Sequence, residues 1–351
     1  MNKKITKLIS MLMAAALALS MCIPAFAAES PVTSVALTST YTLVGNASDG
    51  VSPETEFTYS IEKTSVANQA GGITLANMPV PTFDGGVQSI TFTRGEATQA
   101  GETKSLQLNL PEYTGVGVYT YTVTQQAGNL EGVTYNSGSL VLTVTVTNHT
   151  KTDESDTQLF DCYVAIRESG SDTKLDSIAF ENTYGAATLN VKKVVTGVSA
   201  DKSRSFDFTV TFTKEDGTEV PDGQIEQYVA GIKNDSFLLS WTDNTATASF
   251  QLSDGKTATF TNLPYGVTYK VEETAAAGYT TTYANQENTA GAVDFEQSIE
   301  AVVTNTSIDG TVDTGVNLDN APYLLLLAAV AAAAVAFVVM KSKKHDDDDE
   351  A

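Results

Sequence analysis

The residues with the clearest chemical potential in this sequence are a lysine, a glutamate and an asparagine, each set in the apolar row of a predicted strand. Lys193 lies in residues 189–195, where alternate positions are apolar and should share one buried face. A lone lysine there could reach water along its own stem, because burying an ammonium ion is unfavourable. Glu273 and Asn305, however, are the last residues of similar alternating apolar patterns in the same half of the chain. The sequence therefore predicts that an amine, a carboxyl and a carboxamide face one core.

These three groups could react with one another if they meet in that core. Burial favours the neutral forms of an amine and of a carboxylic acid, and two such groups in contact titrate as a pair. A neutral Lys193 amine is a nucleophile, and the side-chain carbonyl of Asn305 is an electrophile that it could attack. Glu273 could polarise that carbonyl and move protons as ammonia leaves. The expected product is a Lys193–Asn305 isopeptide bond that joins the first and last strands of the second half.

The order of these motifs is similar to that of a known protein family. The strand lysine is followed by LPYGVTYKVEE at residues 263–273 and by VVTNT at residues 302–306. This order resembles the isopeptide-bonded, Ig-like (Cna B-type) β-sandwich domains of Gram-positive pilins. The whole chain resembles the two-domain streptococcal backbone pilin family. The resemblance implies a structural surface protein with Lys193 and Asn305 as the bonded pair and Glu273 as the proton relay.

Composition indicates an all-β protein and excludes several functions. The 351 residues can form two domains, and the short alternating runs rich in Thr, Val, Tyr and Gly are typical of strands. A net charge of −22 is unsuited to binding nucleic acid. Two histidines, and Cys162 as the one cysteine expected after leader removal, offer no metal cluster, and we expect no cofactor. Cys162 itself is expected to be a small buried hydrophobe. We find no catalytic set for turnover, so an enzyme is not expected.

We expect four segments along the chain. They are a signal peptide (1–28), a first Ig-like domain (29–184), a second Ig-like domain (185–307), and a sorting signal with a hydrophobic helix and cytoplasmic tail (308–351). Strands of a β-sandwich are predicted in the first half over residues 32–44, 56–61, 89–93, 105–110, 117–124, 139–147, 160–167 and 178–182. The second half repeats this plan, except that the spacing of apolar residues in 222–232 predicts a short helix.

Matching the two halves residue by residue indicates that the first half has lost the reactive set. Ser39 stands at the position of the lysine, Gln125 at that of the glutamate, and only Asn182 is retained. Serine is not an amine nucleophile, and glutamine cannot relay a proton. We therefore expect no isopeptide bond in the first half.

The two ends of the chain indicate export and retention at the surface. Three early lysines, an apolar run over residues 8–23 and Ala-Phe-Ala at residues 25–27 form a secretory leader, which fits better than lipidation at Cys22. At the other end, TVDTG at residues 311–315 precedes an apolar run over 324–340 and three lysines. A plain membrane anchor is one reading. The resemblance to sortase substrates implies cleavage between Thr314 and Gly315. Residues 324–340 would then contact the membrane only transiently. Val312 stands where the family's sorting motif usually has proline.

The leading hypothesis is a pilin or pilin-like subunit, secreted to the cell wall of a Gram-positive bacterium. A sortase would join it to peptidoglycan or to other pilin subunits. In this family a surface lysine accepts the sorting threonine of the next subunit, and Lys174 is the positional candidate. The alternative is a wall-anchored adhesin displayed singly and binding a host or matrix ligand. Residues 67–86 would then be a candidate display loop.

Overall fold

The computed structural model describes residues 31–45, 50–284, 290–292 and 299–308, together with a few residues between 327 and 333. The predicted signal peptide, the segment with Thr314 and Gly315, and most of the 324–340 run lie outside the described residues. Within the part of the chain that is described, no helix is long and apolar enough to cross a membrane.

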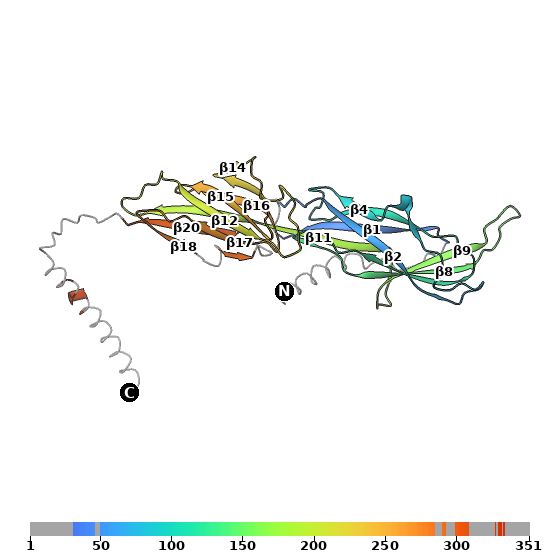
Figure 1. The fold of residues 1–351 in the computed structure, drawn as a ribbon. Helices are drawn as coiled ribbons and strands as arrows, with labels where there is room; N and C mark the ends of the chain where they lie inside the picture. Colours follow the sequence, from blue (N-terminus) through green and yellow to red (C-terminus); the bar gives the residue numbers. More distant parts are fainter. Residues whose placement is uncertain are drawn as a thin grey trace, which may run out of the picture.

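The described chain is built almost entirely from β-strands, as predicted, and forms two sandwiches placed end to end (Figure 1). The elements of the first half are β1 (Ser34–Val44), β2 (Thr55–Ala67), β3 (Thr82–Phe83), the 3-10 turn η1 (Asp84–Gly86), β4 (Ser89–Phe92), β5 (Glu102–Asn109), β6 (Gly117–Gln125), β7 (Val133–Thr134), β8 (Ser139–Asn148), β9 (Phe160–Glu168) and β10 (Lys174–Leu175). The elements that follow are β11 (Ile178–Thr196), β12 (Phe206–Thr213), β13 (Glu226–Val229), β14 (Ile232–Lys233), β15 (Thr245–Leu252), β16 (Thr257–Pro264), β17 (Thr268–Glu273), β18 (Tyr279–Ala284), β19 (Ala290–Ala292) and β20 (Ile299–Ser307). Each of the eight strands predicted in the first half is present.

One long strand, β11, belongs to both halves. Its first part pairs in parallel with β1, and its second part pairs in parallel with β20. The resulting sheet runs through both sandwiches in the order β14-β13-β16-β11-β1-β5-β3, with β7, β18 and β20 attached beside this path. The sheet β10-β9-β8-β6-β2-β4 covers it in the first half, and the sheet β15-β12-β17-β19 covers it in the second. The predicted strand at 178–182 is therefore only the beginning of a longer one.

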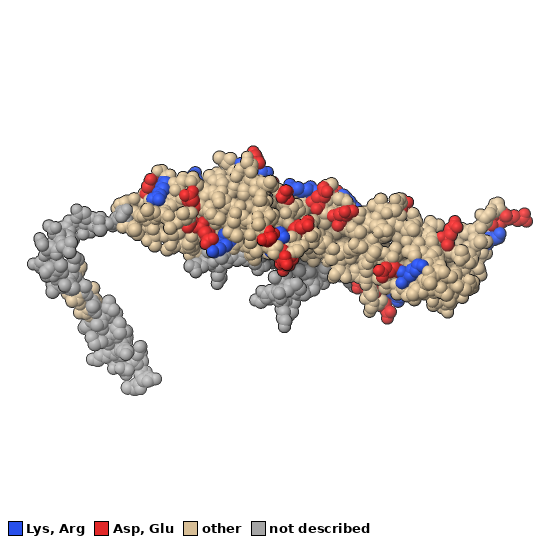
Figure 2. Space-filling model, viewed as in Figure 1, with Lys and Arg blue, Asp and Glu red and all other residues tan. Residues whose placement is uncertain are grey.

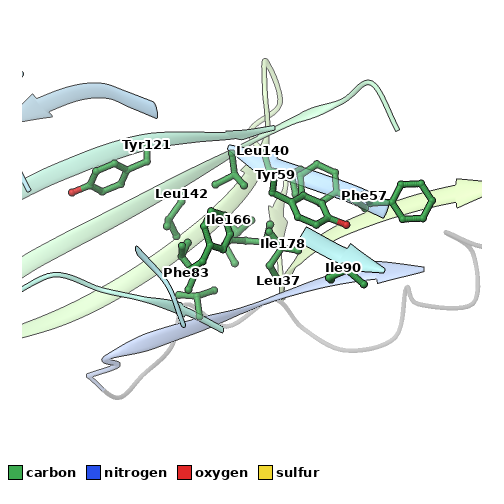
Figure 3. Packing of buried hydrophobic residues seen from close by; sticks show 14 of the residues in the cluster. Leu37, Phe57, Tyr59, Phe83, Ile90, Tyr121, Leu140, Leu142, Ile166 and Ile178 are labelled. Atoms are coloured by element: carbon green, nitrogen blue, oxygen red, sulfur yellow. The ribbon is translucent and has the colours of Figure 1, made fainter. Parts of the chain in front are cut away.

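Each half buries its own apolar core between its two sheets. In the first half, Leu37 and Ile178 from one sheet pack among Tyr59, Leu142 and Ile166 from the other (Figure 3). The burial of β6 alternates without interruption from Gly117 to Gln125, as the period of two in a strand requires. The buried residues of the second core include Leu189, Val191, Val195, Phe208, Phe212, Phe260 and Val303. Tight burial on these faces fixes the strand register, because a slip of one residue would turn every apolar side chain outward.

The helix predicted over residues 222–232 is wrong. The structure has the strand pair β13 and β14 there, joined through Ala230 and Gly231 at φ values of 51° and 80°. Two successive residues with positive φ are typical of the tight turn of a β-hairpin. β13 also pairs with β16, which supplies hydrogen-bond partners that local sequence spacing cannot reveal. Tertiary pairing thus decides the conformation of this segment.

Two other expectations are modified by packing. Cys162, predicted to be a small buried hydrophobe, is half-buried and packs against the first core. Residues 67–86, the candidate display loop, include Ile73 and Met78, which are 5% and 1% exposed. The carbonyl of Pro79 in this segment accepts a hydrogen bond from the Tyr121 hydroxyl at 2.7 Å. The segment is therefore anchored to the core at these points, while most of its residues are exposed.

Hydrogen bonds join the two halves where β11 passes between them. Asn262 adopts a left-handed conformation (φ 56°), and its amide exchanges two hydrogen bonds with the backbone of Val51, at 3.0 and 2.8 Å. Gln224 donates a third bond to the same Val51 carbonyl at 2.7 Å. At Gly185 a Cβ atom would lie 2.0 Å from the ring of Tyr265, so a glycine is required there. The bonds of Asn262 and Gln224 to Val51 anchor the first half to the loops of the second.

The surface is acidic, as the net charge of −22 requires. On the face shown in Figure 2, Asp and Glu side chains are spread over both halves, and the visible Lys and Arg side chains lie mostly beside or among them. Such a surface repels polyanions such as nucleic acids.

Candidate functional site

The lysine, glutamate and asparagine singled out from the sequence lie together in the second half. Lys193 comes from β11, Glu273 ends β17, and Asn305 comes from β20. β11 and β20 are parallel with Lys193 opposite Val303 and Val195 opposite Asn305. Lys193 and Asn305 therefore lie on the same face of neighbouring strands, offset by two residues. Glu273 reaches them from the opposite sheet.

The carboxyl group of Glu273 contacts both nitrogen atoms of the set. Lys193 Nζ lies 2.6 Å from Glu273 Oε2, and Asn305 Nδ2 donates to Glu273 Oε1 at 2.5 Å. The side chains of Lys193 and Glu273 are both 0% exposed. Asn305 is likewise fully buried. An amine, a carboxyl and an amide are thus held in contact away from bulk solvent.

Aromatic rings surround the amine. Lys193 Nζ lies 4.4 Å from the ring centroid of Phe206 and 5.7 Å from that of Phe208. Burial lowers the pKa of the Lys193 amine below its ordinary value, and the contact with Glu273 opposes this effect only in part. A lowered pKa increases the fraction of the neutral amine, which is the nucleophilic form.

The amide of Asn305 is held by one oxygen of the carboxyl and is otherwise poorly satisfied. Its carbonyl oxygen, Oδ1, is buried and has no hydrogen-bond partner among the described residues. An unpaired buried acceptor of this kind is unfavourable by about 1–3 kcal/mol. The asparagine side chain is therefore less stable in this position than a fully bonded amide would be.

The equivalent positions of the first half are arranged with the same geometry. Ser39 lies opposite Phe180 in the parallel ladder of β1 and β11, so that Asn182 is again two residues further along. Gln125 lies opposite Tyr59, as Glu273 lies opposite Phe208. The structure thus brings Ser39, Gln125 and Asn182 together.

In contrast to Asn305, Asn182 makes a complete set of hydrogen bonds. Its Oδ1 accepts from Gln125 Nε2 at 2.6 Å and from the backbone N–H of Asn136 at 2.9 Å. Its Nδ2 donates to Gln125 Oε1 at 3.0 Å and to Ser39 Oγ at 3.3 Å. A paired amide that lies beside a hydroxyl and a second amide has neither a nucleophile nor a proton relay. This arrangement can hold strands together only by hydrogen bonds.

The sorting and linking residues are not part of either set. Lys174 lies exposed on β10, at the edge of the first half, where it pairs with Arg167 of β9. Thr314 and Gly315 lie outside the described residues.

The sequence reasoning missed two residues of β18 that contact Glu273. The hydroxyl of Tyr283 accepts a hydrogen bond from the Glu273 backbone N–H at 3.0 Å. The hydroxyl of Thr281 lies 3.4 Å from Glu273 Oε1. No local signal separates these residues from the other threonines and tyrosines of residues 279–284. Only the pairing of β18 with β20 places them at the site.

Comparison with known proteins finds matches to two domain families and similarity to streptococcal pilus proteins. Residues 39–185 match the Spy0128-like isopeptide containing domain, and residues 187–307 match a domain of unknown function (DUF7601). A pilin of Streptococcus pyogenes serotype M1 is 29% identical over 316 residues, which cover 84% of this chain and 88% of that protein. The chain is a relative of the streptococcal backbone pilins. A pilin-like structural protein is the class that these matches support.

Two further proteins from S. pyogenes are similar to this chain, one over a short segment and the other at lower sequence identity. The pilus tip adhesin Cpa is 35% identical over 92 residues, which cover 26% of this chain and 12% of that protein. The solved structure of the major pilin T3.2 is 24% identical and covers 79% of this chain and 99% of its own, with a TM-score of 0.48.

The isopeptide family match falls on the half of this pilin relative that lacks an amine and an acid at the matched positions. Residues 39–185 contain Ser39 and Gln125, whereas the complete set lies in residues 187–307. The family match alone therefore does not show which half can form an isopeptide bond. The identity of the side chains at the matched positions shows which half has the required amine and acid.

Proposed function

We propose that this chain is a structural subunit of the cell surface whose second half is closed by an isopeptide bond between Lys193 and Asn305. The observation that carries the proposal is the position of the Glu273 carboxyl. One of its oxygens contacts the lysine nitrogen and the other contacts the asparagine nitrogen. These are the two nitrogen atoms whose protons must be exchanged when an amine displaces ammonia from an amide.

The reaction balances without a cofactor or a second substrate. Lys193 Nζ attacks Cγ of Asn305, a C–N bond forms, and the bond from Cγ to Nδ2 breaks. Glu273 accepts a proton from the attacking nitrogen through Oε2 and returns a proton to the departing nitrogen through Oε1. The products are a secondary amide and one molecule of ammonia. The reaction occurs once in each chain, so it is a maturation step and not enzymatic turnover.

The motifs at the two ends of the chain support a proposal for its export and its attachment to the cell wall. In our proposal a secretory leader exports it, and the 324–340 run holds it in the membrane until a sortase cleaves between Thr314 and Gly315. The new carboxyl end of Thr314 is then joined to peptidoglycan or to a lysine of another subunit. Lys174 is a suitable acceptor because its side chain is exposed on an edge strand. The mature protein would stand on the wall of a Gram-positive bacterium.

Replacing Lys174 with arginine tests the polymer form of this proposal. Immunoblots of wall extracts should show a ladder of high-mass species for the wild-type chain, and the Lys174→Arg variant should lose the ladder because a guanidinium is not a nucleophile at neutral pH. Lys151→Arg, at another exposed lysine of the first half, is the matched control and should keep the ladder.

Other outcomes of the blot would redirect the proposal. A ladder that persists in Lys174→Arg would assign the linkage to another lysine. A single band from the wild-type chain would favour an adhesin displayed singly, a role consistent with the short match to the pilus tip adhesin Cpa. A separate measurement, mass spectrometry of wall-released protein, tests the cleavage, and peptides from residues 324–340 in the mature protein would exclude it.

A further inference from the structure

At the end of β17, no strand among the described residues pairs with the backbone N–H of Glu273. The next residue, Thr274, donates its N–H to the carbonyl of Asp207 in β12 at 2.9 Å. In an antiparallel pair the N–H groups of successive residues point to opposite sides, so the Glu273 N–H points away from β12. β19 lies on that side but pairs with β17 only from Thr268 to Lys270. Beyond Lys270, the strand pairing of the described residues supplies no acceptor for Glu273.

Tyr283 supplies the missing acceptor. Its hydroxyl oxygen accepts the Glu273 N–H at 3.0 Å, and its half-buried ring packs against the second core. The tyrosine belongs to β18, which pairs with β20 so that Tyr283 lies opposite Val303 and Thr281 lies opposite Asn305. One strand therefore contacts both the acid and the strand that carries the amide.

Thr281 adds a second contact from the same strand. Its hydroxyl lies 3.4 Å from Glu273 Oε1, the oxygen that also accepts from Asn305 Nδ2. Two side chains of β18 thus act on Glu273, one through its backbone and one through its carboxyl. A shift of β17 by about 1 Å would separate the carboxyl from one of the two nitrogens, and reactions of this kind are sensitive to such a displacement.

We propose that Tyr283 is a positioning residue for the crosslinking reaction, because it holds Glu273 at the point where the carboxyl spans the attacking and leaving nitrogens. The inference rests on the proposed Lys193–Asn305 bond. The role of Tyr283 is indirect, because its hydroxyl bonds the Glu273 backbone and acts on the reaction only through Glu273.

The test compares the rate of ammonia loss in two tyrosine variants of the full chain. Tyr283→Phe removes only the hydroxyl that accepts the Glu273 N–H. Tyr279→Phe is a matched control on the same strand, because the Tyr279 hydroxyl also accepts a backbone N–H, that of Asp201 at 2.9 Å. Each chain is synthesised in a cell-free system, quenched in denaturant at set times and weighed as an intact protein, at several pH values.

We expect Tyr283→Phe to lose ammonia about tenfold more slowly than the wild-type chain, the effect of one well-placed hydrogen bond. Its rate should also reach half of its maximum at a different pH, since moving the carboxyl changes its coupling to the amine. Tyr279→Phe should keep the wild-type rate and pH profile. Equal slowing of both variants without a shift in pH profile, or no slowing of Tyr283→Phe, would overturn the positioning role. A wild-type chain that never loses ammonia would overturn the proposed bond itself.

Discussion

Replacing Lys193 with alanine should remove the covalent bond and lower the free energy of unfolding of the second half by roughly 4–5 kcal/mol. The estimate is by analogy with a disulfide that closes a loop of about a hundred residues. The variant also leaves the Glu273 carboxyl, which is 0% exposed, without its amine partner. A buried polar group left without its partner adds to the loss. Scanning calorimetry should show the second half melting earlier, with the first half little changed.

Two companion variants separate the bond from the packing. Lys193→Met keeps an unbranched side chain of similar length, so it should lose the bond without opening a cavity and should still melt early. Glu273→Gln keeps the shape of the relay but not its proton chemistry, so its mass should stay at that of the unmodified sequence. If Lys193→Met melts with the wild-type protein, no covalent bond contributes to stability. Ammonia loss in Glu273→Gln would exclude the relay role of Glu273.

Converting the first-half set to the second-half residues should create a second isopeptide bond. The register of Ser39, Gln125 and Asn182 repeats that of Lys193, Glu273 and Asn305. Tyr59 must change as well, because it stands at the position of Phe208 and carries a buried hydroxyl that has no hydrogen-bond partner among the described residues. The variant with Ser39→Lys, Tyr59→Phe and Gln125→Glu should therefore lose two molecules of ammonia.

The control for this conversion keeps the glutamine. Ser39→Lys with Tyr59→Phe supplies an amine but no proton relay, and its mass should show the loss of a single ammonia from the second half. In the full conversion, the backbone N–H of Asn136 already points at Asn182 Oδ1 and would stabilise the developing charge on that oxygen. A converted first half that folds but never reacts would show that register and residue type are insufficient for the chemistry.

The alternation of the sequence is sufficient to find both sets of residues. Lys193 follows Leu189 and Val191 at a spacing of two, which places it on the buried face of a strand whatever the partner strands are. The same argument places Ser39, Gln125 and Asn182 on buried faces of the first half. It also predicts the all-β class, because most of the strands have one buried and one more exposed face.

Features that depend on contacts distant in sequence could not be predicted. The apolar spacing of residues 222–232 fits a helix, but the segment pairs with β16 and turns at Gly231. Tyr283 is one of 14 tyrosines, and only the strand order brings it to Glu273. The unpaired Oδ1 of Asn305 likewise depends on which groups surround it in the folded core. Strand order and hydrogen-bond satisfaction are set by long-range packing, which a single sequence does not encode in local patterns.

The most direct test of the central claim is the intact mass of purified residues 28–314, which carry no wall attachment, compared with the mass calculated from their sequence. Formation of one bond predicts a deficit of one ammonia, and a digest should contain a branched peptide that joins Lys193 to Asn305. A deficit of two ammonias would show that the first half also reacts, although Ser39 and Gln125 offer neither an amine nor a proton relay. A mass equal to that of the unmodified sequence would contradict the proposed bond.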